Sequence, residues 1–113
     1  KDTWRHSQAG ADVVCISSPA KMAMIKKVPQ ELLLDEVVSF ISDVDIIFTE
    51  GYKRESKRKI EVFRQAACDS PLCSKEELLA VAADIRLYDD IPCFPLDDAR
   101  EMADFLERTV LKV

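Results

Sequence analysis

Short apolar segments alternate with amphipathic ones along this 113-residue chain, and this pattern constrains the fold more than any other feature. Residues 12–17 read Asp-Val-Val-Cys-Ile-Ser, a nearly continuous apolar run typical of a strand buried on both faces. Residues 45–50 read Asp-Ile-Ile-Phe-Thr-Glu and form the clearest predicted strand. Strands that alternate with helices form a largely parallel sheet flanked by helices. The sequence therefore predicts an α/β fold, and residues 1–113 are expected to form a single domain.

Further strands and two helices complete the expected pattern. Pro29 is predicted to begin a helix with Leu33 and Phe40 on its inner face, because proline is tolerated in a first helical turn. Asp98 is predicted to cap the final helix, with Glu101 completing a capping box. The other strands are expected at residues 60–64, 79–83 and 91–94, and residues 21–28 fit either an edge strand or a short helix.

Composition excludes several classes of protein. With 48% hydrophobic and 33% charged residues, the chain is expected to be globular rather than disordered. Its net charge of -5 argues against nucleic-acid binding, which depends on clustered cations. The sequence shows no membrane-spanning apolar run and no signal peptide. We therefore expect a cytoplasmic protein whose four cysteines are reduced thiols.

Polar residues follow two of the predicted strands, where parallel sheets bind ligands. Glu50 is a carboxylate at a strand end, which could hold the magnesium of a nucleotide through water, and Gly51 would let the backbone approach a phosphate. Asp84 ends the 79–83 strand and could accept two hydrogen bonds from a guanine edge. Each of these residues could equally serve a turn or a cap.

Two further segments carry polar groups suited to anions. Asp2, Thr3 and His6 lie in a polar opening segment that could reach phosphates or magnesium, or could simply begin a helix. The loop from Lys53 to Lys59 holds five basic residues, which could attract an anionic pterin or nucleotide or form a solvated face. No Gly-x-x-x-x-Gly-Lys-Ser/Thr loop, which cradles phosphates, occurs in the sequence.

Taken together, these segments resemble ordered motifs of the molybdopterin-guanine dinucleotide biosynthesis protein B (MobB) family. The resemblance covers nearly all of the chain. The matching segments are residues 1–11 (Lys-Asp-Thr-Trp-Arg-His through Gln-Ala-Gly-Ala), 49–53 (Thr-Glu-Gly-Tyr-Lys), 59–64 (Lys-Ile-Glu-Val-Phe-Arg), 80–84 (Ala-Val-Ala-Ala-Asp) and 95–98 (Pro-Leu-Asp-Asp).

The resemblance implies a P-loop NTPase fold that binds GTP with magnesium and is at most a feeble GTPase. Such a protein assists a molybdenum cofactor guanylyltransferase in attaching a guanine nucleotide to molybdopterin. Glu50 would then be the catalytic carboxylate near magnesium and the γ-phosphate. Asp2 and Thr3 would lie beside the nucleotide, as would Gly51 and Lys53, and Asp84 would recognise guanine.

The family opens with a strand and a glycine-rich phosphate-binding loop that this sequence lacks, so an N-terminally truncated fold is expected. Nucleotide binding by the chain itself thus rests largely on residues outside it. Two alternatives stay open. The chain could be a non-catalytic interaction module that pairs through sheet edges into a homodimer. It could also bind a metal through Cys68, Cys73 and His6.

Overall fold

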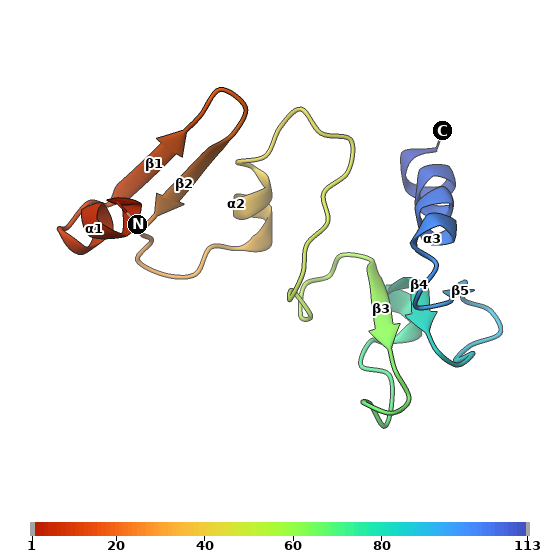
Figure 1. Ribbon diagram of the computed structural model, residues 1–113. Helices are drawn as coiled ribbons and strands as arrows, with labels where there is room; N and C mark the ends of the chain where they lie inside the picture. Colours follow the sequence, from red (N-terminus) through yellow and green to blue (C-terminus); the bar gives the residue numbers. More distant parts are fainter. Residues whose placement is uncertain (1, 113) are drawn as a thin grey trace. The chain divides into compact units, whose positions relative to one another are not determined.

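The computed structural model describes residues 2–112, whose contacts gather in two compact units, Lys1–Phe40 and Ile41–Val113 (Figure 1). Lys1, the first residue of the opening motif, lies outside the described residues. No helix within residues 2–112 is long and apolar enough to cross a membrane.

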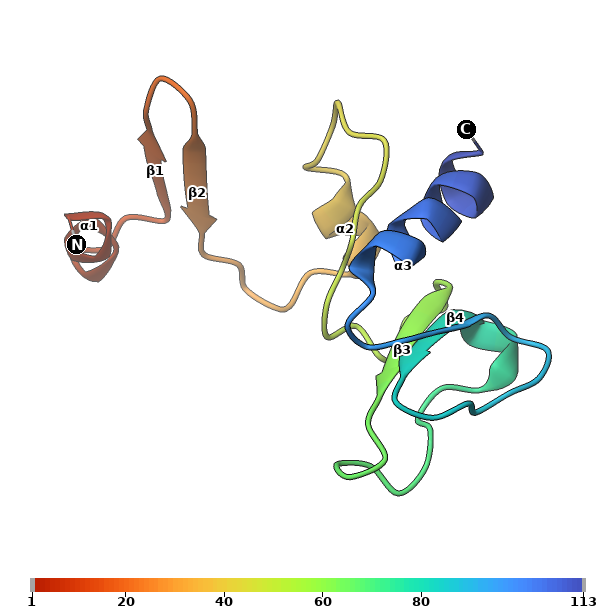
Figure 2. The ribbon, with the colours of Figure 1, turned by 45° about the vertical axis from the view of Figure 1, so that its right-hand side comes forward.

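The first unit is built on a β-hairpin (Figure 2). Its strands pair antiparallel, and Ser18 and Lys21 exchange backbone and hydroxyl hydrogen bonds of 2.7–3.2 Å across the turn. The ambiguous 21–28 segment is therefore a strand. Because it pairs with the 12–17 segment, that segment is neither parallel nor buried on both faces, and Val14 is its only buried residue. The unit contains α1 (Asp2–Gln8), β1 (Val13–Ser17), β2 (Met22–Lys26) and α2 (Leu34–Val38).

The helix expected from Pro29 begins five residues later, at Leu34. It starts where its free backbone donors find an acceptor, since the Glu36 carboxylate accepts a 2.7 Å hydrogen bond from the Leu33 N–H. Leu33 and Phe40 were expected to face inward, but they are 67% and 69% exposed. Leu34 is the buried residue of this short helix.

The strand expected at residues 45–50 is also not formed, and the segment is irregular. An extended segment becomes a strand only when a neighbour accepts its backbone hydrogen bonds. Among residues 2–112, strand pairs form only between β1 and β2 and within the sheet of the second unit, so residues 45–50 have no ladder partner. Glu50 and Gly51 consequently lie in a loop rather than at a strand end.

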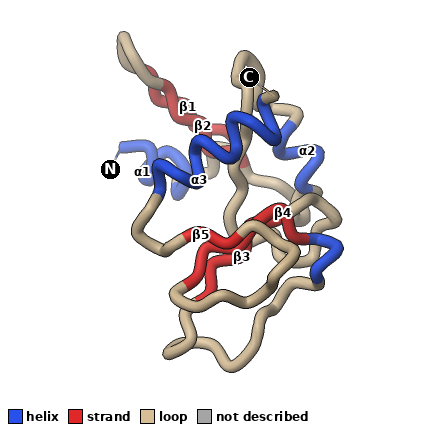
Figure 3. Tube along the Cα trace, turned by 90° about the vertical axis from the view of Figure 1, so that its right-hand side faces the viewer, coloured by secondary structure: helices blue, strands red, loops and turns tan. Residues whose placement is uncertain are grey.

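The second unit is built on a parallel three-stranded sheet with the order β3-β4-β5 (Figure 3). The strands expected at residues 60–64, 79–83 and 91–94 are all present, the last shortened to two residues. With helices beside this sheet, the predicted α/β fold class is confirmed. The unit contains β3 (Lys59–Phe63), the 3₁₀-helix η1 (Lys75–Glu77), β4 (Leu78–Ala83), β5 (Cys93–Phe94), α3 (Ala99–Leu106) and a π-helical end, η2 (Glu107–Leu111).

The core of the second unit centres on β4, where Ala80 and Val81 are fully buried and Leu78 is 4% exposed. Phe63 of β3 is 3% exposed and joins this cluster. Alternate side chains of a strand share a face, so Glu61 lies on the same face as Phe63, and it is 8% exposed. The inner face of β3 thus carries a charged residue.

The predicted Asp98 cap of the final helix is confirmed, but the reciprocal bond from the Glu101 side chain that would complete a capping box is not formed in this helix. The Asp98 carboxylate accepts a 3.0 Å hydrogen bond from the Glu101 N–H, which is an N-cap interaction. Phe105 of α3 packs on Phe94 of β5 with ring centroids 5.1 Å apart, and Leu106 is buried. The helix is therefore fastened to the last strand of the sheet.

Candidate functional site

The six residues predicted for the site lie in three segments. Asp2 and Thr3 begin α1 in the first unit. Glu50, Gly51 and Lys53 lie together in the loop before β3, and the Lys53 N–H donates a 2.9 Å hydrogen bond to the Gly51 carbonyl. The sixth, the aspartate at position 84, follows β4. The roles assigned to these residues from the sequence stay predictions.

Gly51 adopts a conformation that suits an approach to a ligand. Its φ of 90° lies in the left-handed region, which other residues rarely adopt. Among the described residues, no heavy atom outside Gly51 and its two chain neighbours lies within 4 Å of the place where a Cβ would be. Glu50 beside it is exposed. Magnesium in nucleotide sites is held by one or two carboxylates together with phosphates and water. A single exposed carboxylate next to open backbone fits that requirement, although residues 2–112 contain no group of three metal-ligating side chains.

An open cleft of about 780 Å³ lies in the second unit where β4 ends. Its walls are residues 83–86, which leave β4, and residues 89–97, which enter and leave β5. Carboxylates outnumber cations on these walls. Among the described residues that line the cleft, Arg86 is the only cation, against the carboxylates of Asp84, Asp89, Asp90 and Asp97. Asp89 pairs with Arg86 at 3.5 Å, and Asp90 pairs with Lys75 at 2.7 Å.

Asp84 stands at the rim of this cleft and also ties two strands together. Its Oδ1 and Oδ2 accept hydrogen bonds of 3.0 and 3.3 Å from the Gln65 N–H, just after β3. An ionised carboxylate has about four acceptor positions, so one shared N–H leaves capacity for further donors. The side chain is exposed and can therefore still accept hydrogen bonds from a ligand.

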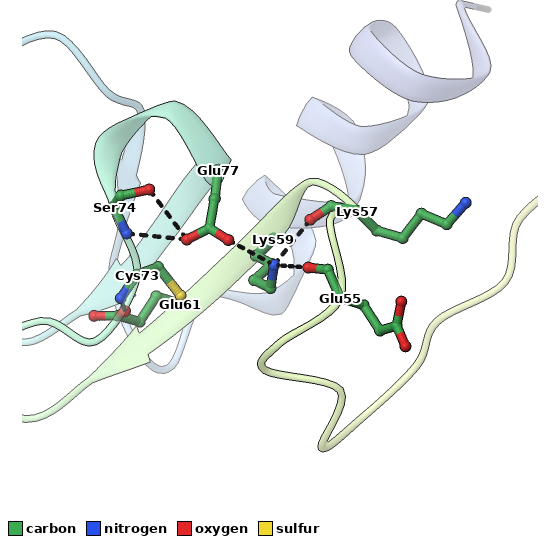
Figure 4. A network of polar contacts seen from close by, with 7 residues as sticks. All are labelled: Glu55, Lys57, Lys59, Glu61, Cys73, Ser74 and Glu77. Carbon is green, nitrogen blue, oxygen red and sulfur yellow. Dashed lines mark hydrogen bonds and ion pairs between the residues drawn. The ribbon is translucent and has the colours of Figure 1, made fainter. Parts of the chain in front are cut away.

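A polar network lies at the other end of β3 (Figure 4). The Lys59 ammonium donates to the Glu55 carbonyl, to the Lys57 carbonyl at 3.2 Å and to the Glu77 carboxylate at 3.1 Å. The Lys59 side chain is only 13% exposed. Lys59 therefore makes its hydrogen bonds within the protein. The predicted attraction of anions by the basic loop would have to come from the other cations of that loop.

Glu61 holds a second loop, the one containing Cys73. Its Oε1 accepts hydrogen bonds of 2.9 Å from the Leu72 N–H and 2.6 Å from the Cys73 N–H. Partial burial, followed by the hydrogen bond and negative charge of Glu61, raises the pKa of the Cys73 thiol from 9.0 to about 11. Cys73 therefore holds its proton to a higher pH than an ordinary thiol.

Sequence reasoning missed the structural roles of Lys59 and Glu61. Both appeared in the 59–64 motif as part of a strand, and Lys59 was also counted among the cations of the basic loop. The available signal was the presence of two charged residues at alternate positions, on the face that ends in Phe63. Charges that share a face with a core aromatic are seldom buried without partners, so this pattern indicates internal hydrogen bonds.

Comparison with known proteins supports the reading of the motifs. The family model described as "MobB: Molybdopterin guanine dinucleotide synthesis protein B" matches residues 1–84. The chain belongs to the MobB family. The resemblance predicted from the sequence motifs is confirmed.

Relatives in this family are similar to the chain over most of its length. The molybdopterin-guanine dinucleotide biosynthesis adapter protein of Escherichia coli (strain K12) is 32% identical, over 94% of this chain and 64% of that protein. The corresponding adapter protein of Haemophilus influenzae (strain ATCC 51907 / DSM 11121 / KW20 / Rd) is 30% identical, over 95% of this chain and 61% of that protein. The chain therefore spans less than two thirds of these relatives.

Solved structures agree with the fold. A crystal structure of molybdopterin-guanine biosynthesis protein B (MobB) is 31% identical and matches with a TM-score of 0.72, over 93% of this chain and 72% of that one. The structure of Bacillus subtilis MobB is 19% identical and matches with a TM-score of 0.69, over 92% of this chain and 71% of that one. The second likeness concerns the fold alone.

Proposed function

We propose that this chain is the part of a MobB-family adapter that binds the guanine end of GTP during assembly of molybdopterin guanine dinucleotide. In this role the protein presents the nucleotide, with magnesium, to a molybdenum cofactor guanylyltransferase in the cytoplasm. The work is positioning rather than covalent chemistry, with at most a weak GTPase activity. The relatives are named as adapters of this biosynthesis, which supports the proposal.

The observation that carries this proposal is the acidic cleft at the end of β4, with Asp84 at its rim. Asp89 pairs with Arg86 and Asp90 pairs with Lys75, so the remaining negative charge of the cleft comes from Asp84 and Asp97. This charge disfavours phosphates, because like charges repel. It suits the N–H donors of a purine edge instead. Guanine presents an N1–H and an N2 amino group side by side, and a carboxylate accepts from both.

The phosphate end is assigned to the loop with Glu50, Gly51 and Lys53. When bound, magnesium would neutralise phosphate charge, with the Glu50 carboxylate oriented toward it through water. Gly51 would leave room for a phosphate, and the exposed Lys53 would attract the anionic nucleotide or pterin. The nucleotide-binding roles of Asp2 and Thr3, which begin α1, stay predictions from the sequence.

Calorimetry with GTP and magnesium tests this proposal on the full-length protein that contains this segment. We expect Asp84→Asn to weaken GTP binding by about tenfold or more, because an amide cannot accept both guanine donors. The same variant should gain affinity for xanthosine triphosphate, whose N–H and C=O match an amide. Asp104→Asn, an exposed position on α3, is the matched control. Equal binding of GTP and ATP by the unaltered protein would refute guanine recognition.

Hydrolysis provides a separate test of Glu50. We expect Glu50→Gln to lower the slow turnover of GTP by about tenfold or more while GTP still binds, because an amide is a poorer partner for magnesium-bound water. Turnover that is unchanged in this variant would remove Glu50 from the site.

The hairpin of the first unit favours a second function, self-association. Ile16, Met24 and Ile25 are 56–60% exposed on strands whose outer edges are both free within the described unit. An isolated hairpin is marginally stable, and exposed apolar edges pair with other strands. We propose that a second copy of the chain is the partner.

Sedimentation tests the dimer directly. Met24→Lys should shift the protein to monomer, because it places a charge on the apolar edge strand. The matched control is Val110→Lys, at an apolar position of the second unit that is 42% exposed. This variant should leave the dimer intact. A monomeric unaltered protein at high concentration would exclude this function.

A further inference from the structure

All three protons of the Lys59 ammonium have acceptors within the protein. They are the carbonyls of Glu55 and Lys57 and the carboxylate of Glu77 (Figure 4). An ammonium has three donors and no acceptor, so Lys59 has no donor left for a phosphate or pterin. With its side chain 13% exposed, it is the least suited cation of the basic loop for ligand contact.

These bonds reach back toward the candidate magnesium site. The Glu55 carbonyl accepts from Lys59, and the Glu55 N–H donates to the Tyr52 carbonyl at 3.4 Å. One residue earlier, the Gly51 carbonyl accepts from the Lys53 N–H at 2.9 Å. A series of contacts therefore connects the Lys59 ammonium to the backbone next to Glu50, in a segment without regular secondary structure.

The carboxylate of Glu77, which accepts from Lys59, is itself held by further hydrogen bonds. Glu77 Oε2 accepts from the Ser74 N–H and from the Ser74 hydroxyl, both at 3.1 Å, at the start of η1. The hydrogen bond from Lys59, followed by those from Ser74, lowers the pKa of the Glu77 carboxyl. Glu77 is thus an ionised anchor on an ordered turn just before the buried strand β4.

We propose that Lys59 is a positioning residue that orders residues 51–58 against η1 and thereby holds Glu50, Gly51 and Lys53 in place for magnesium and nucleotide. This inference rests on the proposed function of that loop. Lys59 acts through the loop and touches no ligand.

The test compares Lys59→Met, Lys59→Arg and Lys21→Met in the full-length protein. Lys21 lies in the exposed hairpin turn and provides the same change of side chain outside the loop. Two properties are measured at a temperature where all variants are folded. They are amide hydrogen exchange of Lys53 and Glu55, and the magnesium concentration that half-saturates GTP binding.

We expect Lys59→Met to speed exchange at these amides and to raise the half-saturating magnesium concentration, each by about tenfold, which corresponds to the loss of one charged hydrogen bond. Lys59→Arg should recover much of both effects, because guanidinium can still donate to Glu77. Lys21→Met should match the unaltered protein. A merely structural lysine would alter stability without changing the magnesium requirement.

Unchanged exchange at Lys53 and Glu55 in Lys59→Met would overturn the proposal. So would faster exchange with an unchanged magnesium requirement, because the loop would then be ordered for some other purpose. If the unaltered protein binds no GTP with magnesium, the proposed function is wrong, and this inference, which rests on it, is wrong as well. The two failures are therefore distinguishable by the unaltered protein alone.

Discussion

The two units place strands of similar apolar character in opposite environments. In the hairpin, Ile16, Met22 and Ile25 are 58–64% exposed. In the parallel sheet, Leu78 and Val81 are at most 4% exposed. β1 (Val-Val-Cys-Ile-Ser) is about as apolar as β4 (Leu-Leu-Ala-Val-Ala-Ala), so composition alone does not decide burial. A central strand with a neighbour on each side and a helix packed nearby is buried, whereas two strands cannot cover their own faces.

Matched phenylalanine substitutions give the largest expected contrast between the units. Phe63 is 3% exposed in the second unit, and Phe40 is 69% exposed in the first. We expect Phe63→Ala to lower the free energy of unfolding by about 3–5 kcal/mol, through lost burial and a cavity, and Phe40→Ala to change it by less than about 0.5 kcal/mol. Urea denaturation followed by circular dichroism measures both. Equal losses would mean that Phe40 is covered in solution.

A buried carboxylate should have the next largest effect. Glu61→Ala leaves the N–H groups of Leu72 and Cys73 without their acceptor, at a cost of about 1–3 kcal/mol in the free energy of unfolding. Glu31→Ala, at an exposed glutamate of the first unit, should leave the urea midpoint unchanged. A Glu61→Ala midpoint as high as that of the control would show that water replaces the carboxylate.

The thiols extend the same comparison to reactivity. Cys15 is exposed on the hairpin, whereas the pKa of Cys73 is raised to about 11. At about pH 8 we expect Ellman's reagent to modify Cys73 more than tenfold more slowly than Cys15, because the thiolate is the reacting species. Variants that retain one cysteine each separate the signals. Glu61→Gln should speed the modification of Cys73 by the reagent. Similar rates for both thiols would contradict the raised pKa of Cys73.

The raised pKa of Cys73 also has a consequence for stability. The folded protein keeps a proton that the unfolded chain releases above its ordinary pKa of 9.0. The stabilisation is therefore complete below pH 9 and is lost as the pH rises through about 11. A Cys73→Ala variant should lack this part of the alkaline decline.

Exposed contacts of lysine ammonium groups should have the smallest effects in both units. Lys75 and Asp90 approach to 2.7 Å in the second unit, and Lys27 donates to the Ser7 carbonyl at 3.2 Å in the first. Exposed pairs gain little because water and salt screen them. Neither Lys75→Met nor Lys27→Met should move the urea midpoint at physiological salt. A clear loss for either would show that its contact is shielded from solvent.

The sequence predicted the second unit better than the first. Strands β3 and β4 and the Asp98 cap follow from local patterns, and the structure has all three. The segment at 45–50 has an equally strong pattern but forms no strand, because a strand depends on a partner that its own residues do not supply. Organisation as one domain stays a prediction.

The candidate site also contains residues that local sequence predicts and residues whose contacts depend on distant parts of the chain. Glu50, Gly51 and Asp84 were found from their order along the chain, and the structure shows which surfaces they occupy. The bonds of Lys59 to Glu77 and of Glu61 to Cys73 span 18 and 12 residues. The alternation of charges in β3 indicates that they are hydrogen-bonded internally, but no local pattern specifies partners at such separations, so only the folded chain reveals which groups they bind.

The bond from Gln65 to Asp84 has a consequence for how this family could change. Asp84 secures the junction of two strands and also stands at the rim of the cleft. A substitution that alters ligand preference there would loosen the strand junction as well. Variation in specificity would then be expected first among the other cleft residues, and Asp84 would change only together with a compensating residue near Gln65.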